Sequence, residues 1–427
     1  MSSGLTTQEI AVENVTTTRS YRVLQVLDCS LPVVAGYTVR SRDIVNAQRA
    51  IGFFPTVVTG PLHELLDKTS CPLEIEGTRY HRTQLKGIRG KLIRNRVPVL
   101  SQASVVQLLK KRILQVLDSG QYDVVHAHSP VLCGLAGLQA ARARKLPFVY
   151  EIRAFWEDAA VDQNKTTEKS LRYRGTRALE QHVIGGADAV VCIAENMLND
   201  LESRGFSRNK LFHVPNGVDI EKFKPRARDA ELATKLGIGN KTVFGFIGTL
   251  FRFEGVRWLV EAAAQLKQQG QQFKLIIVGD GEDAADTKAA IAALNASEYI
   301  LFTGRVPADE VARYYSIMDV LVYPRVSIRL TELVTPLKPL EAMSQDKAVL
   351  ASNVGGLREL VQHDLTGLTF TPGDKEDFCR QAARLFDPDL RHDLALQGRQ
   401  HVIESRNWIS IARRYEKVYK TASRTRN

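Results

Sequence analysis

The sequence predicts an α/β protein made of two doubly wound domains, each built on a mainly parallel sheet. Short apolar, partly β-branched runs alternate with helical patterns through both halves of the chain, which is typical of parallel sheets covered by helices. A Pro- and Gly-containing stretch at residues 215–224 separates the two series and predicts a linker. Trp408, Ile411, Tyr415 and Tyr419 recur at helical spacing, so the chain is expected to end in a helix whose apolar stripe docks elsewhere.

The expected elements follow one another in a regular order. In the N-terminal half the strands are expected within residues 21–27, 56–59, 122–130, 148–153, 189–193 and 211–219. In the C-terminal half they are expected at residues 242–247, 273–278, 300–302, 320–323 and 348–351. We therefore divide the chain into a disordered, polar leader (1–20), an N-terminal domain (21–219), a C-terminal domain (220–400) and a terminal helix with its tail (401–427).

The composition excludes several classes of protein. With 427 residues, 44% of them hydrophobic, the chain can bury two cores, but it has no apolar run near the roughly 18 residues of a membrane helix. The Thr/Ser-rich start lacks the apolar segment of a secretory signal. The five cysteines are scattered without a Cys-x-x-Cys pair, which predicts reduced thiols in a cytoplasmic protein and argues against a metal site.

The net charge of +11 is concentrated in one segment. Residues 76–118 contain ten Lys or Arg residues and no acid between the two ends. Nucleic acid, anionic lipid and a pyrophosphate-bearing substrate are all compatible partners, but no nucleic-acid-binding motif supports the first. Leu85, Ile88 and Leu92 lie among these cations at roughly helical spacing, interrupted by two glycines. The segment is thus either an amphipathic element lying on a membrane or a solvated basic loop.

The loop after the first expected strand, residues 28–38, is a candidate anion site. Gly36 would let the backbone approach a phosphate, and the following helix would point its N-terminal N–H groups at it. A simple turn is the alternative reading of one glycine.

Two histidines end the third expected strand of the N-terminal half. We expect His126 and His128 to point to opposite faces of that strand, and so not to share a ligand unless the strand has ended. Pro130 suggests that it has. His128 is then either a buried structural residue or a residue facing substrate at the carboxyl end of the sheet.

The chain is organised around residues 329–343, where an expected strand gives way to a helix. Ligands bind at such junctions because helix N-termini and strand carboxyl ends converge there. Lys338 and Glu341, three apart on one helical face, would meet a phosphate and a ribose diol. The alternative is a surface ion pair.

Several ordered motifs resemble a known family over about residues 21–421. They are Val214-Pro-Asn-Gly-Val-Asp219, Val278-Gly-Asp-Gly281, Glu341-Ala-Met343 and Val354-Gly-Gly-Leu-Arg-Glu359. Together they resemble the retaining family 4 glycosyltransferases of GT-B fold. More narrowly, Val26-Leu-Asp-Cys-Ser-Leu-Pro32, Gly36-Tyr-Thr38, Tyr323-Pro-Arg325 and residues 330–343 resemble the exosortase/PEP-CTERM-associated subgroup, which is linked to bacterial exopolysaccharide clusters.

The resemblance implies two Rossmann-like domains, with the terminal helix crossing back to the N-terminal one. It implies that the C-terminal domain grips a nucleotide-sugar while the N-terminal domain supplies the acceptor. Glu341 would bind the ribose hydroxyls, Gly36 would approach the diphosphate, and His128 would face the donor sugar. The remaining residues expected around the donor are Thr249, Thr335 and Leu337.

Two departures from the family pattern affect the site. The family's first acid falls at Leu333, so the nearby Glu332 is one residue out of register for its catalytic place. The family's phosphate-binding Arg and Lys are replaced here by Thr249 and Glu254. A departing diphosphate gains negative charge, so we expect Arg252 and Lys338 to supply the missing cations.

We predict a metal-independent, retaining, hexosyl-type transfer from a UDP- or GDP-linked sugar to a saccharide, with no cofactor. The acid-free basic segment is the reason to expect that this saccharide is carried on a polyprenyl diphosphate at a membrane surface. Neither an Asp-x-Asp motif nor a cluster of His or Cys ligands lies near the proposed site, which argues against a metal there. Arg89, Lys91 and Arg94 would contact the acceptor or an anionic membrane, which places a cytoplasmic protein on the inner face of the plasma membrane. The alternatives are a non-catalytic scaffold of a polysaccharide assembly complex and a nucleotide-sugar epimerase on the same fold.

Overall fold

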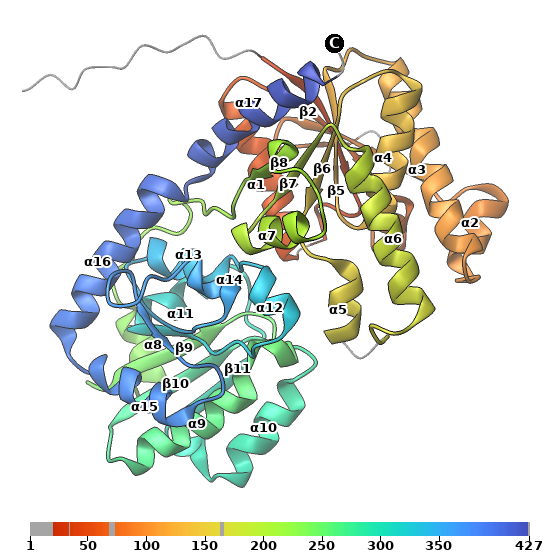
Figure 1. Cartoon of the computed structure of the whole chain (residues 1–427). Coiled ribbons are helices and arrows are strands. Elements are labelled where there is room, and N and C mark those ends of the chain that lie inside the picture. The colour runs from red at the N-terminus through yellow and green to blue at the C-terminus, as the bar shows by residue number, and fades with distance from the viewer. Residues whose placement is uncertain (1–19, 34, 68–72, 163–165, 426–427) are drawn as a thin grey trace, which may run out of the picture.

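The computed structural model describes residues 20–33, 35–67, 73–162 and 166–425. Two open β-sheets, each flanked by helices, form the two domains of one elongated molecule (Figure 1). The predicted architecture of two doubly wound, Rossmann-like domains is confirmed. The expected leader lies outside the described residues, apart from Ser20.

The N-terminal sheet has eight strands in the order β3-β4-β2-β1-β5-β6-β7-β8. Its strand pairs are parallel, except that β3 runs antiparallel to β4. Because β1 lies between β2 and β5, the order reverses there, and a crevice forms at the carboxyl ends of β1 and β5. The strands are β1 Arg22–Leu27, β2 Phe54–Thr59, β3 Leu73–Ile75, β4 Thr78–Arg82, β5 Val124–His128, β6 Phe148–Ile152, β7 Ala189–Cys192 and β8 Leu211–His213.

The C-terminal sheet has six strands in the order β11-β10-β9-β12-β13-β14, all paired in parallel. Its centre is apolar on both faces, as a parallel sheet between two helix layers requires. The strands are β9 Thr242–Ile247, β10 Phe273–Val278, β11 Ile300–Gly304, β12 Val320–Tyr323, β13 Ala348–Ser352 and β14 Leu368–Phe370.

The helices cover both faces of each sheet. In the N-terminal domain, α3, α4 and α6 pack on one face, while α1 and α17 cover the other. The helices of this domain are α1 Gly36–Ala50, α2 Gly87–Arg94, α3 Leu100–Asp118, α4 Val131–Ala143, α5 Trp156–Asp162, α6 Leu171–Gly186 and α7 Glu195–Ser203. The later helices are α8 Ala230–Lys235, α9 Val256–Gln268, α10 Ala284–Ala293, α11 Val311–Ile317, α12 Arg329–Leu333, α13 Lys338–Ser344, α14 Gly355–Arg358, α15 Lys375–Arg384, α16 Pro388–Ser405 and α17 Trp408–Arg424.

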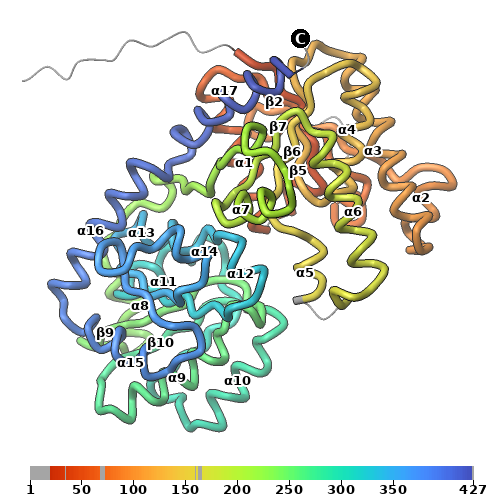
Figure 2. Tube along the Cα trace, in the orientation of Figure 1, coloured from red at the N-terminus to blue at the C-terminus, as the bar shows by residue number. Residues whose placement is uncertain are grey.

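The terminal helix crosses from the second domain to the first, as Figure 2 traces in blue. Its apolar stripe, predicted from Trp408, Ile411, Tyr415 and Tyr419, is buried together with residues of β1, β5, β6, β7 and α1. The helix therefore completes a face of the N-terminal sheet. This burial is what fixes its position, since apolar area removed from water stabilises by about 25 cal/mol per Å².

The basic segment, residues 76–118, is not the solvated loop that was one of its two predicted alternatives. It contains β4, α2 and α3, and α2 forms in spite of its two glycines. Gly90 is needed because a Cβ there would lie 2.5 Å from the carbonyl oxygen of Leu85. The hairpin of β3 and β4 was not predicted, because its strands are short and polar. Among the described residues no helix is long and apolar enough to cross a membrane.

Candidate active site

The N-terminal part of the site is a buried polar cluster centred on Glu151 of β6. Glu151 accepts hydrogen bonds from Arg40 of α1 at 3.3 Å and from Arg153 at 3.0 Å. The hydroxyl of Tyr415 on α17 donates to its other oxygen. Burial alone would raise the pKa of this carboxyl, but the neighbouring charges, led by Arg40, hold the pKa well below its usual range. Glu151 is thus a charged anchor that joins three distant segments of the chain.

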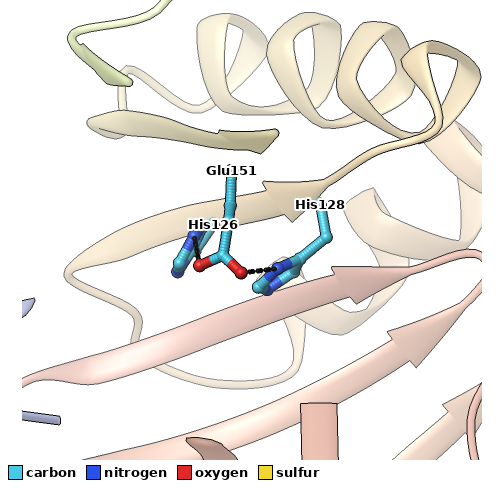
Figure 3. A group of neighbouring side chains, drawn as sticks. All are labelled: His126, His128 and Glu151. Carbon is cyan, nitrogen blue, oxygen red and sulfur yellow. Dashed lines mark ion pairs between the residues drawn. The ribbon is translucent and has the colours of Figure 1, made fainter. Parts of the chain in front are cut away.

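His126 and His128 lie on the same face of β5 and stack with ring centroids 4.3 Å apart (Figure 3). The expectation of opposite faces was wrong, because side chains alternate along a strand and residues two apart share a face. Glu151 lies against both rings, with closest distances of 3.6 Å to His126 Nε2 and 3.3 Å to His128 Nδ1.

The hydrogen bonds of His128 define its protonation. Arg153 can only donate, so His128 Nδ1, 2.7 Å from the guanidinium, must accept. Nε2 therefore carries the proton and donates to Gln25 Oε1 at 2.6 Å. Burial, followed by the charge of Arg153, lowers the pKa of His128 to about 4. His128 is neutral, only 2% exposed, and has both nitrogens engaged. Its arrangement is that of the buried structural residue, with no ring nitrogen offered to a donor sugar.

The three residues His126, His128 and Glu151 could in principle hold a metal ion, since their ligand atoms lie within 4.8 Å of one another. Their partners do not fit a cation. Glu151 is already neutralised by Arg40 and Arg153, and both guanidinium groups would repel an ion placed among them. We therefore interpret the group as an ion-pair network.

The C-terminal part of the site contains an ion cluster at the end of β9. Glu254 binds Arg325 through both oxygens, at 3.0 and 3.3 Å, and lies 2.8 Å from Lys338 Nζ. Burial alone would raise the pKa of Glu254, but these cations, Arg325 first, lower it to about 2. Lys338 also lies 4.7 Å from the ring centre of Phe246. The cluster holds two cations against one carboxylate and is net positive.

Gly248 makes room for this lysine. Its φ is +153°, and a Cβ at this position would lie 2.9 Å from Lys338 Cε. Burial lowers the pKa of Lys338, which the ion pair with Glu254 partly opposes. The sequence identified Arg325 only as part of the motif Tyr323-Pro-Arg325. Arg325 reaches Glu254 because β12, which precedes it, pairs with β9, and the sequence did not predict that pairing.

Glu341 lies in the first turn of α13, as the sequence predicts. Its carboxylate accepts a 3.4 Å hydrogen bond from Tyr315 and is otherwise short of partners among the described residues. Burial raises the pKa of the Glu341 carboxyl, and the positive charges of Lys222 and Lys338 partly oppose that shift. A partly buried carboxylate with free lone pairs suits the diol of a ribose.

Glu332, the second catalytic candidate, is used inside the C-terminal domain. One oxygen accepts from the backbone N–H of Gly355 at 2.7 Å, and the other accepts from Ser327 at 2.7 Å. Its backbone carbonyl accepts from Asn196 of the other domain at 3.0 Å. The side chain of Glu332 thus points toward the start of α14.

The other expected donor residues fall into two groups. Thr335 is buried, bonds Asn216 and donates to the Ile193 carbonyl, and Leu337 packs with the apolar cluster that holds α17. Both therefore join the two domains. The second group, Gly36, Thr249 and Arg252, is exposed. A Cβ on Gly36 would meet nothing within 4 Å. A phosphate could therefore approach the backbone there, but no neighbouring atom requires a glycine at this position.

The basic residues of α2 lie on the surface. Arg89 and Lys91 are exposed, and Arg94 pairs with Glu64 at 2.8 Å. Ile88 beside them is 79% exposed. The helix thus presents cations around an apolar side chain.

The sequence missed the contacts that hold the two domains together. Arg329 binds Asp158 and Asp200 of the N-terminal domain, each at 2.7 Å. Glu359 accepts hydrogen bonds at 3.0 Å from the backbone N–H groups of Glu195 and Asn196, which begin α7. The carboxyl-end loops of both sheets therefore face each other.

Two family models match the chain. The model described as Glycosyltransferase Family 4 matches residues 35–222, and that described as Glycosyl transferases group 1 matches residues 241–387. A GDP-mannose-dependent alpha-mannosyltransferase from Mycobacterium tuberculosis is 29% identical over 298 residues, which cover 70% of this chain and 72% of the relative. The UDP-Gal:alpha-D-GlcNAc-diphosphoundecaprenol alpha-1,3-galactosyltransferase of Escherichia coli is 26% identical over 335 residues, with coverages of 77% and 80%.

Solved structures share the fold. Sucrose-phosphate synthase from Thermosynechococcus elongatus superposes with a TM-score of 0.73 at 20% identity, covering 93% of this chain and 98% of its own. HepE from Anabaena, solved in complex with UDP, has a TM-score of 0.71 at 18% identity and coverages of 93% and 99%. At these identities the likeness concerns the arrangement of the two domains.

Proposed function

Because the chain is a GT-B glycosyltransferase, we propose that it transfers a sugar, with retention of configuration and without a metal, from a UDP- or GDP-linked donor to a lipid-linked saccharide in exopolysaccharide biosynthesis. The observation that carries the donor assignment is the placement of Glu341 beside the net positive cluster of Lys338, Arg325 and Glu254. A carboxylate for a ribose and cations for a diphosphate then stand at the carboxyl end of one parallel sheet.

The proposed chemistry demands little of acid or base side chains. The bond between the anomeric carbon and the diphosphate oxygen breaks, and the acceptor oxygen bonds to the same face of that carbon. The acceptor's proton passes to the departing diphosphate. Lys338, Arg325 and Arg252 would stabilise the charge that develops on this group, which is the largest single contribution in such sites.

The nucleotide choice rests on relatives. The mycobacterial relative is named for GDP-mannose and the Escherichia coli relative for UDP-Gal, so both bases stay in the proposal. The second of these names also includes a diphosphoundecaprenol-linked acceptor, which supports a lipid carrier here. The cations and the exposed Ile88 of α2 suit an anionic membrane surface on which such an acceptor resides.

A thermal-shift panel tests the donor assignment. UDP, GDP, ADP and their glucose, galactose and mannose conjugates are added to the full chain, and UDP or GDP is expected to raise the midpoint in proportion to its binding. If no nucleotide raises the melting midpoint, the proposed enzymatic function is contradicted and the non-catalytic scaffold is favoured. Release of free sugar in place of transfer would favour the epimerase, and NMR of the product showing inversion would contradict retention.

A further inference from the structure

Two tyrosine hydroxyl groups lie against the first turn of α13, the turn that carries Lys338 and Glu341. Tyr315 comes from α11 and Tyr323 from the end of β12. Both side chains are only 1% exposed, so their hydroxyl groups need partners within the protein. A buried hydroxyl group without a partner is destabilising, and phenylalanine would fill the same space without that cost. The two hydroxyl groups therefore point to a role at this turn.

Each hydroxyl group bonds a different part of the turn. Tyr315 donates to Glu341 Oε2 at 3.4 Å, and Tyr323 donates to the backbone carbonyl of Lys338 at 2.9 Å. A tyrosine hydroxyl group has one proton. Because Tyr323 gives its proton to a carbonyl, its oxygen is left to accept a hydrogen bond from Tyr315. The hydroxyl group of Tyr315 is thus held between the Glu341 carboxylate and Tyr323.

This arrangement distinguishes the two oxygens of the Glu341 carboxylate. Oε2 accepts from Tyr315, whereas Oε1 accepts no hydrogen bond from any of the described residues. The charged groups that face the carboxylate are Lys222 of the linker, Lys338 of α13 and Asp43 of α1. The two lysines favour its charged form and Asp43 opposes it. A donor that holds one oxygen orients the plane of the carboxylate and leaves the other oxygen for a ligand.

We propose that Tyr315 is a positioning residue for the nucleotide: its hydroxyl group orients the Glu341 carboxylate so that Oε1 receives the ribose diol, while Tyr323 holds the start of α13. This role of Tyr315 rests on the proposed glycosyltransferase function and extends it, since ribose recognition then depends on a residue that does not touch the donor. Tyr315 acts only through Glu341.

The hydrogen bond has a consequence for pH dependence. Burial raises the pKa of Glu341, and the hydrogen bond from Tyr315 is among the contributions that lower it. Removal of this bond therefore raises the pKa of Glu341 further. The carboxyl group is then protonated at a higher pH, and the preference for ribose is lost at a higher pH.

Tyr315→Phe tests the role, because it removes one oxygen atom and keeps the ring. Isothermal titration at a series of pH values measures the ratio of the affinities for UDP and 2′-deoxy-UDP, or for the GDP pair if GDP gives the thermal shift. The ratio cancels the titration of the diphosphate itself. It is expected to be about tenfold in the wild type at pH 7.5 and about threefold or less in Tyr315→Phe. Tyr314→Phe is the control, since the hydroxyl group of this neighbour on α11 bonds none of the described residues.

A double-mutant cycle separates positioning from packing. In a Glu341→Ala background, Tyr315→Phe is expected to change neither affinity, because the group through which it acts is absent. The positioning role is overturned by a wild-type ratio in Tyr315→Phe, by loss of the ratio at the same pH as in the wild type, or by an equal effect of Tyr315→Phe with and without Glu341. A wild type that binds nucleotide without preferring the ribose form also overturns it. A wild type that binds no nucleotide refutes the proposed function instead.

Discussion

Lys338 at the start of α13 and Glu254 in the loop after β9 form an ion pair of 2.8 Å. The pair explains how a carboxylate can occupy a position where the family resemblance implies a lysine. The cation comes from a distant helix, and Arg325 keeps the carboxylate neutralised from its other side. Cationic character at the end of β9 is thus retained by residues that the family pattern does not use.

Replacing Lys338 or Arg252, the proposed phosphate contacts, should weaken the binding of the donor. Lys338→Met is expected to raise the donor KM about tenfold or more, because a charged hydrogen bond contributes about 1.5–3 kcal/mol. Arg325 still pairs with Glu254, so the fold should persist. Arg252→Ala should act in the same direction, and Lys375→Ala, a surface lysine bound to Glu261, serves as the control. Near-normal turnover in both test variants would end the idea that these cations replace the missing ones.

The ribose contact of Glu341 can be tested with a pair of nucleotides. The wild type is expected to bind UDP or GDP about tenfold more tightly than the 2′-deoxy form, because the carboxylate accepts from the 2′-hydroxyl. Glu341→Ala should bind both forms equally. Isothermal titration measures the difference, with Glu376→Ala, an exposed acid of α15, as the control. Preserved discrimination in Glu341→Ala rules out the contact.

Glu180 should make stability depend on pH. Burial, followed by the charge of Glu157, raises the pKa of Glu180 from 4.5 to about 8, and one of its oxygens accepts from Tyr150. A carboxyl whose pKa is raised on folding stabilises the protein below pH 4.5 and loses that contribution as the pH rises toward 8. Between pH 4.5 and pH 8 the free energy of unfolding of Glu180→Gln should therefore rise by on the order of 2–4 kcal/mol relative to that of the wild type.

Urea unfolding at a series of pH values measures this difference. Gln181→Glu, its neighbour on α6, provides a variant of the same helix in which a charge is added near the surface. An equal pH slope in wild type and Glu180→Gln would show that Glu180 is not held protonated by burial.

Membrane contact through α2 predicts a charge-reversal effect. Changing Arg89, Lys91 and Arg94 to Glu should abolish co-sedimentation with phosphatidylglycerol vesicles, because each cation near an anionic surface contributes about 1 kcal/mol. The matched control reverses three exposed cations of α17, namely Arg413, Lys417 and Lys420. Binding that survives the α2 change but not the α17 change would move the contact surface to the terminal helix.

Local patterns predicted much of the fold. The strands from β9 to β13 and the terminal helix were recognised because period and composition reflect backbone geometry and burial. The hairpin of β3 and β4 was missed, since these short strands have no continuous apolar run. Glu341 lies in the first turn of α13, as the helical pattern predicted. The hydrogen bonds of Glu332 could not be predicted, because they depend on the local path of α12 and on the N–H of Gly355.

The sequence by itself determined the two α/β domains, the amphipathic stripe of α17 and the concentration of cations in residues 76–118, because each is a property of neighbouring residues. Only the tertiary structure decided which buried charges pair. Glu151 meets Tyr415, and Glu254 meets Lys338, across long stretches of chain. These outcomes follow from strand order and helix docking, which bring together groups whose spacing along the chain carries no information about their contact.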